Sequence, residues 1–223
     1  MINNINFVIE DGYNTSYIDS LIIALFYTPS CLQELLSKTS KKSKFCYLQD
    51  LILNVIELIR KNFSISSALI NEIRNYSFIC GWKIGIDFFG LTERYNIVDY
   101  LTFILDNFDY SGIQYKLNNS ICNSEQLLKI NYIELCPTKD SDCSDLLDSW
   151  IDDILLINNQ KYHFIFSDLP SLIPLYINRK SDTMQIDIKK AIRFNKNNDK
   201  FQKKIIWKIH SIICLSSSFP NKY

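Results

Sequence analysis

Ser16 stands at the start of a predicted helix, where its side chain can serve as a nucleophile or cap the helix. The apolar residues that follow recur at the spacing of a core-facing helix that Pro29 ends: Ile18, Leu21, Ile22, Leu25 and Phe26. A serine hydroxyl attacks a carbonyl only when an adjacent base takes its proton. Serine is also among the best N-cap residues, because its oxygen accepts a hydrogen bond from a backbone amide. Since the sequence offers no such base, we predict the capping role for Ser16.

Histidine and cysteine side chains are the other candidates for catalysis or metal binding. His163 and His210 each lie in a strand-like run without a metal-ligand partner at helical or hairpin spacing, so we expect structural imidazoles. Cys143 lies close to Asp142 and Asp145 and lacks a cation that would stabilise a thiolate, so a substitute nucleophile is not expected there. The 7 cysteines form no CxxC pair, which predicts reduced thiols and no metal or other cofactor.

The charge pattern does not favour a nucleic-acid partner. The chain has 24 Lys and Arg against 24 Asp and Glu, so its overall field is weak. Lysines in the last third are dispersed beside predicted strands, which is typical of edge protection. One predicted helix carries a row of acids that is either a solvated face or a surface for a basic protein tail: Asp142, Asp145, Asp148, Asp152 and Asp153.

Targeting signals are not evident in the sequence. Residues 1–11 lack a basic stretch followed by an apolar one, and no apolar run reaches the roughly 18 residues that a membrane span needs. Together with the cysteine pattern, this predicts a chain without a membrane partner in a reducing compartment inside the cell, the cytoplasm or the nucleus. The sequence does not indicate an oligomeric state.

The apolar periodicity predicts an α+β fold. The chain has 223 residues, 47% of them hydrophobic, which suits a single domain with a sizeable core. After the Ser16 helix, the pattern predicts helices at 47–61, 97–108 and 145–155. Short β-branched and aromatic runs predict strands at 129–135, 162–166, 172–177, 184–188 and 205–214. We therefore expect a helical lobe (1–110), an antiparallel sheet lobe (111–223) and a ligand cleft between them.

Four motifs in this order resemble the ubiquitin-specific protease family. The segment from Asn14 to Leu21, followed by Ala24-Leu25-Phe26, is similar to the family's cysteine box, Asn-Thr-Cys-Tyr followed by an apolar helix. Three further matches are Asn96 to Asp106, the Leu169-Pro170 strand with its closing Arg179, and Trp207 to Ile213. The resemblance implies a papain-like fold of thumb and palm lobes with a cleft for a ubiquitin tail. It also implies binding roles for Asn14, Thr15, Tyr17, Asp99, Tyr100 and Tyr223.

The chain departs from this family at the positions that perform catalysis. Ser16 replaces the thiol, Lys222 replaces the histidine, and Asp11 replaces the oxyanion-stabilising Asn. The chain ends at Tyr223, before the family's third catalytic residue, and we expect Tyr223 to lie close to Ser16. We therefore expect an inactive domain that binds ubiquitin, a ubiquitin-like modifier or another protein. The alternative is an active isopeptidase whose sequence is truncated or altered here.

Overall fold

The computed structural model describes residues 8–10, 12, 14–28, 36, 43–61, 63–82, 96–108, 110–118, 125–152, 154–157, 160–166, 172–179, 184–189, 191–194, 205–208 and 211–213. The chain divides into two compact units. Unit 1 comprises Met1–Tyr110 with His210–Tyr223, and unit 2 comprises Ser111–Ile209.

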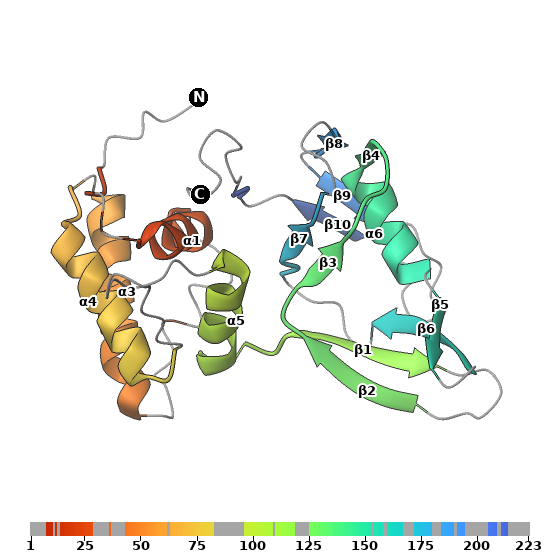
Figure 1. Ribbon diagram of the computed structural model, residues 1–223, viewed down its shortest axis with the longest axis horizontal. Helices are drawn as coiled ribbons and strands as arrows, with labels where there is room; N and C mark the ends of the chain where they lie inside the picture. The colour runs from red at the N-terminus through yellow and green to blue at the C-terminus, as the bar shows by residue number, and fades with distance from the viewer. Residues whose placement is uncertain are drawn as a thin grey trace, which may run out of the picture. The chain divides into compact units, whose positions relative to one another are not determined.

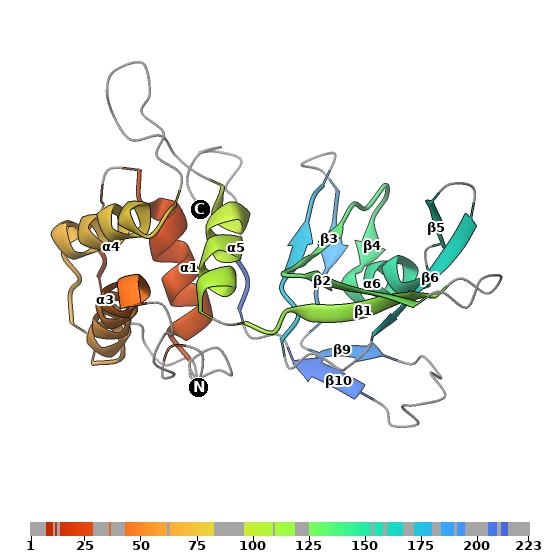
Figure 2. The same ribbon diagram turned by 90° about the horizontal axis from the view of Figure 1, so that it is seen from below.

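The described helices of unit 1 confirm that the N-terminal half is helical. They are α1 (Ser16–Phe26), α3 (Ser43–Arg60), α4 (Ser67–Ile79) and α5 (Ile97–Asn107) (Figure 1). Helix α1 contacts each of the other three and lies between α4 and α5 (Figure 2). The predicted helix at 47–61 begins four residues earlier than expected, and α4 was not predicted at all.

The C-terminal ends of three helices share one hydrogen-bond pattern. After α4, the Trp82 amide donates to the Ser77 carbonyl at 2.8 Å and the Gly81 amide to the Phe78 carbonyl at 2.9 Å. Gly81 has a φ of +102°, which glycine adopts without steric cost. The matching long-range bond closes α3, from Phe63 to Leu58 at 3.0 Å, and α5, from Tyr110 to Leu105 at 3.1 Å. These bonds use carbonyls that a helix end leaves without partners.

A cluster of aromatic rings forms much of the core of unit 1. The ring of Tyr100 lies edge-on to those of Tyr17 and Trp82, each with a centroid separation of 5.2 Å. Phe103 extends the cluster from Trp82 and Tyr100 to Phe45. Offset and edge-to-face aromatic pairs stabilise a core beyond the area that they bury. The cluster joins α1, α3 and α5 to Trp82, which lies three residues after the end of α4.

Helix α1 is held at its C-terminal end, and the segment that precedes it is attached to α4. The Arg60 guanidinium donates to the Phe26 carbonyl at 2.8 Å, which places a cation at the negative end of the α1 dipole. Upstream of α1, Ile9 pairs with Ile65 in a short parallel bridge, and a Glu10 carboxylate oxygen accepts from the Ser67 amide at 3.0 Å. Glu10 thus adds an acceptor at the start of α4, where the N-cap Ser66 accepts from the Leu69 amide.

Unit 2 combines one helix with short strands, as expected for the C-terminal half. The helix is α6 (Cys143–Asp152). A four-stranded antiparallel sheet has the order β2-β1-β6-β5, formed by Glu125–Ile130, Ile113–Asn118, Gln160–Phe166 and Ile154–Ile157. Strands β9 (Ala191–Phe194) and β10 (Ile205–Lys208) form an antiparallel pair. Two pairs are parallel: β3 (Ile133–Leu135) with β7 (Leu175–Ile177), and β4 (Ser141–Asp142) with β8 (Ile186–Asp187).

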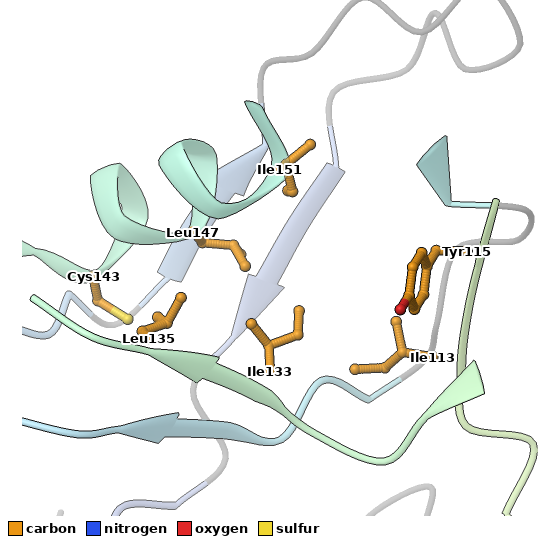
Figure 3. Close-up of a cluster of buried hydrophobic side chains, with 7 residues drawn as sticks. All are labelled: Ile113, Tyr115, Ile133, Leu135, Cys143, Leu147 and Ile151. Atoms are coloured by element: carbon orange, nitrogen blue, oxygen red, sulfur yellow. The ribbon is translucent and has the colours of Figure 1, made fainter. Parts of the chain in front are cut away.

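The described core of unit 2 lies beneath one face of α6. Figure 3 shows Cys143, Leu147 and Ile151 projecting from α6 toward Ile133 and Leu135 of β3, with Ile113 and Tyr115 of β1 beside them. The three α6 residues recur every fourth position and therefore share one side of the helix. All seven side chains are buried, so the helix is fixed to the strands by an apolar contact.

Several sequence predictions for unit 2 were wrong in their limits. The helix predicted at 145–155 ends at Asp152, and Ile154 and Leu155 belong to β5. The strand predicted at 129–135 is two strands separated by a bend at Asn131 and Tyr132. The expectation of an antiparallel lobe holds for the larger sheet, whereas the β3–β7 and β4–β8 pairs are parallel. Apolar periodicity marks buried segments but does not show where a bend divides them.

Gly81→Ala is predicted to lower the free energy of unfolding by about 1 kcal/mol, because an L side chain strains a backbone with positive φ. An added Cβ would meet no heavy atom of the described residues within 4 Å, so the effect isolates the backbone. Urea unfolding measures the change. Gly81→Asn is the matched control and should lose less, because asparagine tolerates the left-handed region. Equal stability of the alanine variant and the parent protein would contradict the prediction.

Candidate functional site

The start of α1 carries the residues that the sequence marks for chemistry. Ser16 is the first residue of the helix and is half-buried, while Thr15 occupies the N-cap position. The Thr15 carbonyl accepts from the Ile18 amide at 2.8 Å and the Asp19 amide at 3.2 Å. The prediction that Ser16 caps the helix was therefore wrong by one position. The hydroxyl of Ser16 belongs to the first turn, at the positive end of the dipole.

The backbone before Ser16 is tightly turned. Asn14 has a φ of +54°, in the left-handed region that asparagine tolerates better than most residues. Thr15 is fully buried. A Cβ on Gly12 would lie 2.4 Å from the Thr15 hydroxyl oxygen, so the chain passes close to this side chain. Glycine at position 12 and asparagine at 14 allow the turn that presents Ser16.

The apolar stripe of the helix predicts Asp19 on or near the opposite, polar face, whereas the structure half-buries the residue at this site. Its carboxylate Oδ2 accepts from the Thr15 hydroxyl at 3.2 Å, and its Oδ1 is buried. Asp19 therefore places a carboxylate in the first turn of the helix that begins at Ser16. The available sequence signal was its spacing, because residues three and four apart on a helix are neighbours.

Tyr17 and Tyr100 lie in the core of unit 1, each 1% exposed. The Tyr100 hydroxyl oxygen is 2.9 Å from the Ser77 hydroxyl oxygen, and Ser77 also donates to the Ile73 carbonyl at 2.8 Å. Burial raises the pKa of Tyr100 well above its usual value. Asp99, the preceding residue on α5, is exposed in the first turn of its helix. The two tyrosines thus pack α1 against α5, whereas Asp99 faces solvent.

Several residues that the sequence places at the site fall outside the part of the chain that the structure describes. Asp11, Lys222 and Tyr223 lie outside the described residues, as does His210. His163 is on β6 of unit 2, in register with Asn118 of β1 and Ile154 of β5. The described part of the site is therefore the first turn of α1 with its neighbours on α4 and α5.

One residue of the acidic row, Asp142, forms a hydrogen bond and an ion pair at the start of α6. Asp142 accepts from the Ser144 amide at 2.7 Å through Oδ1, and its Oδ2 lies 2.5 Å from Lys189 Nζ. The hydrogen bond from Lys189 lowers the pKa of Asp142. Burial and then the nearby Asp142 charge raise the pKa of Cys143, which opposes thiolate formation. Asp145 is exposed, and Asp153 lies outside the described residues.

The described residues offer neither a metal site nor a membrane span. No group of three or more His, Cys, Asp and Glu side chains in this part of the chain is placed to hold a metal ion. Among the helices described, none has the length and apolar character to cross a bilayer.

Comparison with known proteins gives matches in structure alone. No family model matches the sequence, and no curated protein does. The structure of the Ubp8-Sgf11-Sgf73-Sus1 SAGA DUB module is similar to this chain with a TM-score of 0.56 and 14% identity. The match covers 90% of this chain and 54% of that one, so this chain spans about half its length. The fold is therefore an α+β fold like that of the ubiquitin-specific proteases.

A second structural match, the Neurospora crassa Pan2 catalytic unit (protease and nuclease domain), has a TM-score of 0.49 and 14% identity. It covers 78% of this chain and 37% of that one.

Asp142→Asn and Asp142→Ala are predicted to separate the ion pair from the helix cap. The pKa of Asp142 is lowered in the folded state, so its ionic contribution is complete above the unfolded value of about 3.9 and disappears as pH falls through the folded value. Asp142→Asn keeps an oxygen for Ser144 but loses the ion pair with Lys189, which should cost under about 1 kcal/mol at pH 7. Urea unfolding between pH 2 and 7 measures the loss, which should shrink at the acidic end.

Asp142→Ala is the matched comparison for this experiment. It also removes the cap on Ser144 and should cost about 1 kcal/mol more than Asp142→Asn at every pH. Equal losses in the two variants would show that the cap contributes nothing to stability.

Proposed function

We propose that this chain is a ubiquitin-specific-protease-like domain that binds ubiquitin or a ubiquitin-like protein and does not cleave it. The observation that carries the proposal is the position of the Asn14-to-Leu21 motif. It begins α1, the helix that packs against the Asp99-Tyr100 motif of α5, in a chain whose fold is like that of this protease family. Two motifs about 80 residues apart in the sequence thus form one contact.

The case against cleavage is chemical. A hydroxyl is a weak nucleophile near neutral pH and needs a base within hydrogen-bonding reach. The sequence aligns Lys222 with the family's histidine, and an ordinary lysine is protonated at neutral pH and cannot accept that proton. Asp11 aligns with the oxyanion donor, where a carboxylate would repel the developing charge. At the aligned positions the chain thus carries neither the family's base nor its oxyanion donor.

The predicted binding residues divide into two groups, and Thr15, the fully buried N-cap of α1, belongs to the buried one. Tyr17 and Tyr100 act from the core by holding α1 against α5. Asn14, Asp99 and Tyr223 are the residues that we propose to contact the bound protein. The comparison structure contains Ubp8 with Sgf11, Sgf73 and Sus1, which supports a protein partner for this chain. We propose a location inside the cell, in the cytoplasm or the nucleus.

The first test of the proposal measures binding and turnover on the same preparation. Calorimetric titration with ubiquitin should show saturable binding. A fluorogenic ubiquitin C-terminal reporter should show hydrolysis no faster than in buffer. Ubiquitin without its C-terminal tail is the matched control and should bind more weakly, because a protease-like cleft takes the tail. Asp99→Ala should weaken binding if this exposed acid contacts the partner.

Two outcomes would contradict the proposal. Turnover abolished by Ser16→Ala would identify an active hydrolase. If the chain bound neither ubiquitin nor ubiquitin-like modifiers, the proposed ubiquitin-binding function would be wrong, and its partner would be another protein.

The second test rebuilds the missing chemistry. The triple variant Ser16→Cys, Lys222→His and Asp11→Asn supplies a thiol, an imidazole and an amide at the three aligned positions. It should form a covalent adduct with an electrophilic ubiquitin C-terminal probe, because an imidazole beside a thiol generates the attacking thiolate. Mass spectrometry of the adduct is the measurement. We expect the thiol pKa in Ser16→Cys alone to be at least about one unit higher than in the triple variant. Because one pKa unit changes the thiolate fraction tenfold, the adduct should be at least about tenfold less abundant in Ser16→Cys alone.

A folded triple variant that neither binds ubiquitin nor forms the adduct would limit the family resemblance to fold. Circular dichroism of the triple variant and the parent protein establishes that the variant is folded.

A further inference from the structure

We propose that one side of the α3–α4 pair is an interface through which two copies of this chain form a dimer. This surface, the tyrosine patch, consists of Lys44 and Tyr47 of α3 with Glu72, Tyr76 and Ile79 of α4. All five residues belong to unit 1, and none of them belongs to the site at the start of α1. The proposal therefore goes beyond the proposed binding of ubiquitin and does not depend on it.

Contacts between the two helices show that α3 and α4 run in opposite directions. The Lys44 ammonium donates to the Cys80 carbonyl at 3.3 Å, and the rings of Tyr47 and Tyr76 have a centroid separation of 4.5 Å. The residue number thus rises along α3 as it falls along α4. The two helices lie side by side in Figure 1 and contact each other along their length.

This direction fixes the order of the residues along the patch. Lys44 lies at the end where α4 finishes, beside Ile79. The ring pair lies in the middle. Glu72 comes four residues before Tyr76 on α4, and therefore lies about one helical turn, or about 6 Å, beyond the rings. The patch thus has a cation at one end, aromatic rings at its centre and an anion at the other end.

The centre of the patch is exposed and held in place. The side chain of Tyr47 is 44% exposed, and Ile79 is 65% exposed. The Tyr47 hydroxyl donates to a Glu72 carboxylate oxygen, which fixes the ring across the two helices. Tyrosine is a frequent anchor residue of protein interfaces, and an anchor that is ordered before binding loses less entropy when it binds. A partner can therefore bury this surface at a low entropic cost.

The charged groups at the two ends retain hydrogen-bonding capacity for a partner. A lysine ammonium has three donors, and Lys44 uses one of them on the Cys80 carbonyl. A carboxylate has two oxygens that accept hydrogen bonds, and Glu72 accepts from Tyr47 through Oε1. Both residues are exposed. Each can therefore form an ion pair across an interface without losing its contact within unit 1.

A two-fold axis through the ring pair makes the patch complementary to itself. Rotation by 180° about such an axis places Lys44 of one copy opposite Glu72 of the other copy, and this contact occurs twice. The two pairs of tyrosine rings then face each other, with charged groups around them, as in the apolar centre and polar rim of many interfaces. A uniformly acidic partner would meet Glu72, and a uniformly basic one would meet Lys44. The charge pattern therefore favours a second copy, and the small patch predicts a weak dimer.

The test measures self-association of charge-reversed variants by analytical ultracentrifugation, from about 10 µM to about 1 mM protein. The parent chain should show a monomer–dimer equilibrium in this range. Lys44→Glu and Glu72→Lys each bring like charges together twice, so each should raise the dimer dissociation constant at least about tenfold. An equimolar mixture of the two variants should restore the dimer, because both contacts between opposite charges are regained in the mixed pair.

Control substitutions make the same charge changes away from the patch. Lys61→Glu and Glu57→Lys alter an exposed pair at the other end of α3 and should leave the dissociation constant within about twofold of the parent value. Circular dichroism establishes that the variants are folded. No ubiquitin is present, so failure of this proposal is distinguishable from failure to bind ubiquitin.

A cross-linking experiment locates the interface directly. A carbodiimide joins an amine to a carboxylate that it contacts, and a mixture of ¹⁵N-labelled and unlabelled chains shows whether the two groups come from different copies. Mass spectrometry should identify a peptide in which Lys44 of one copy is joined to Glu72 of the other.

Three outcomes would overturn the proposal. A parent chain that stays monomeric over the whole concentration range would exclude the dimer. A dimer that both charge reversals leave unchanged would use another surface. Failure of the mixed, folded variants to associate as the parent chain does would show that Lys44 and Glu72 do not face each other.

Discussion

The fold of unit 1 depends on one buried contact, the pairing of the Tyr100 and Ser77 hydroxyls within the aromatic cluster. A buried hydroxyl without a partner costs about 1 to 3 kcal/mol. The pairing at 2.9 Å therefore lets a tyrosine of α5 and a serine of α4 both lie in the core. Once Tyr100 is fixed there, its ring packs edge-on against Tyr17 of α1. The helix that presents Ser16 is thus held by its second residue.

The start of α1 owes its chemistry to the same packing. With Tyr17 directed into the core, the first turn of the helix brings Asp19 back to the Thr15 hydroxyl. Ser16, between Thr15 and Tyr17, remains half-buried. The close approach of Gly12 to Thr15 completes the turn that precedes the helix. The positions of the Ser16 hydroxyl and of the Asp19 carboxyl group three residues later therefore follow from how α1 packs within unit 1.

Unit 2 is organised by apolar contact between α6 and its strands. Asp142 caps the helix start and pairs with Lys189, which follows β8, while Leu147 and Ile151 reach β3. A two-stranded parallel pair has little stability by itself. The β3–β7 and β4–β8 pairs persist because α6 covers the first and the Asp142 ion pair connects the two sides of the second. Lys189 and Asp142 are 47 residues apart, and no sequence pattern links them.

Apolar periodicity along the chain predicts the helical first half, the strand-rich second half and the helix that begins at Ser16, because it records which face of a segment is buried. It did not reveal α4, since Ser77 interrupts the apolar stripe at a buried position. The Ser77 hydroxyl donates to the Ile73 carbonyl within α4, and the tertiary structure adds its pairing with the buried Tyr100 hydroxyl. The N-cap assignment failed by one residue, because Thr15 and Ser16 both suit that position and packing selects between them. The place of Asp19 was likewise decided by tertiary packing, because a hydrogen bond to Thr15 and burial fix its carboxyl group at the start of α1.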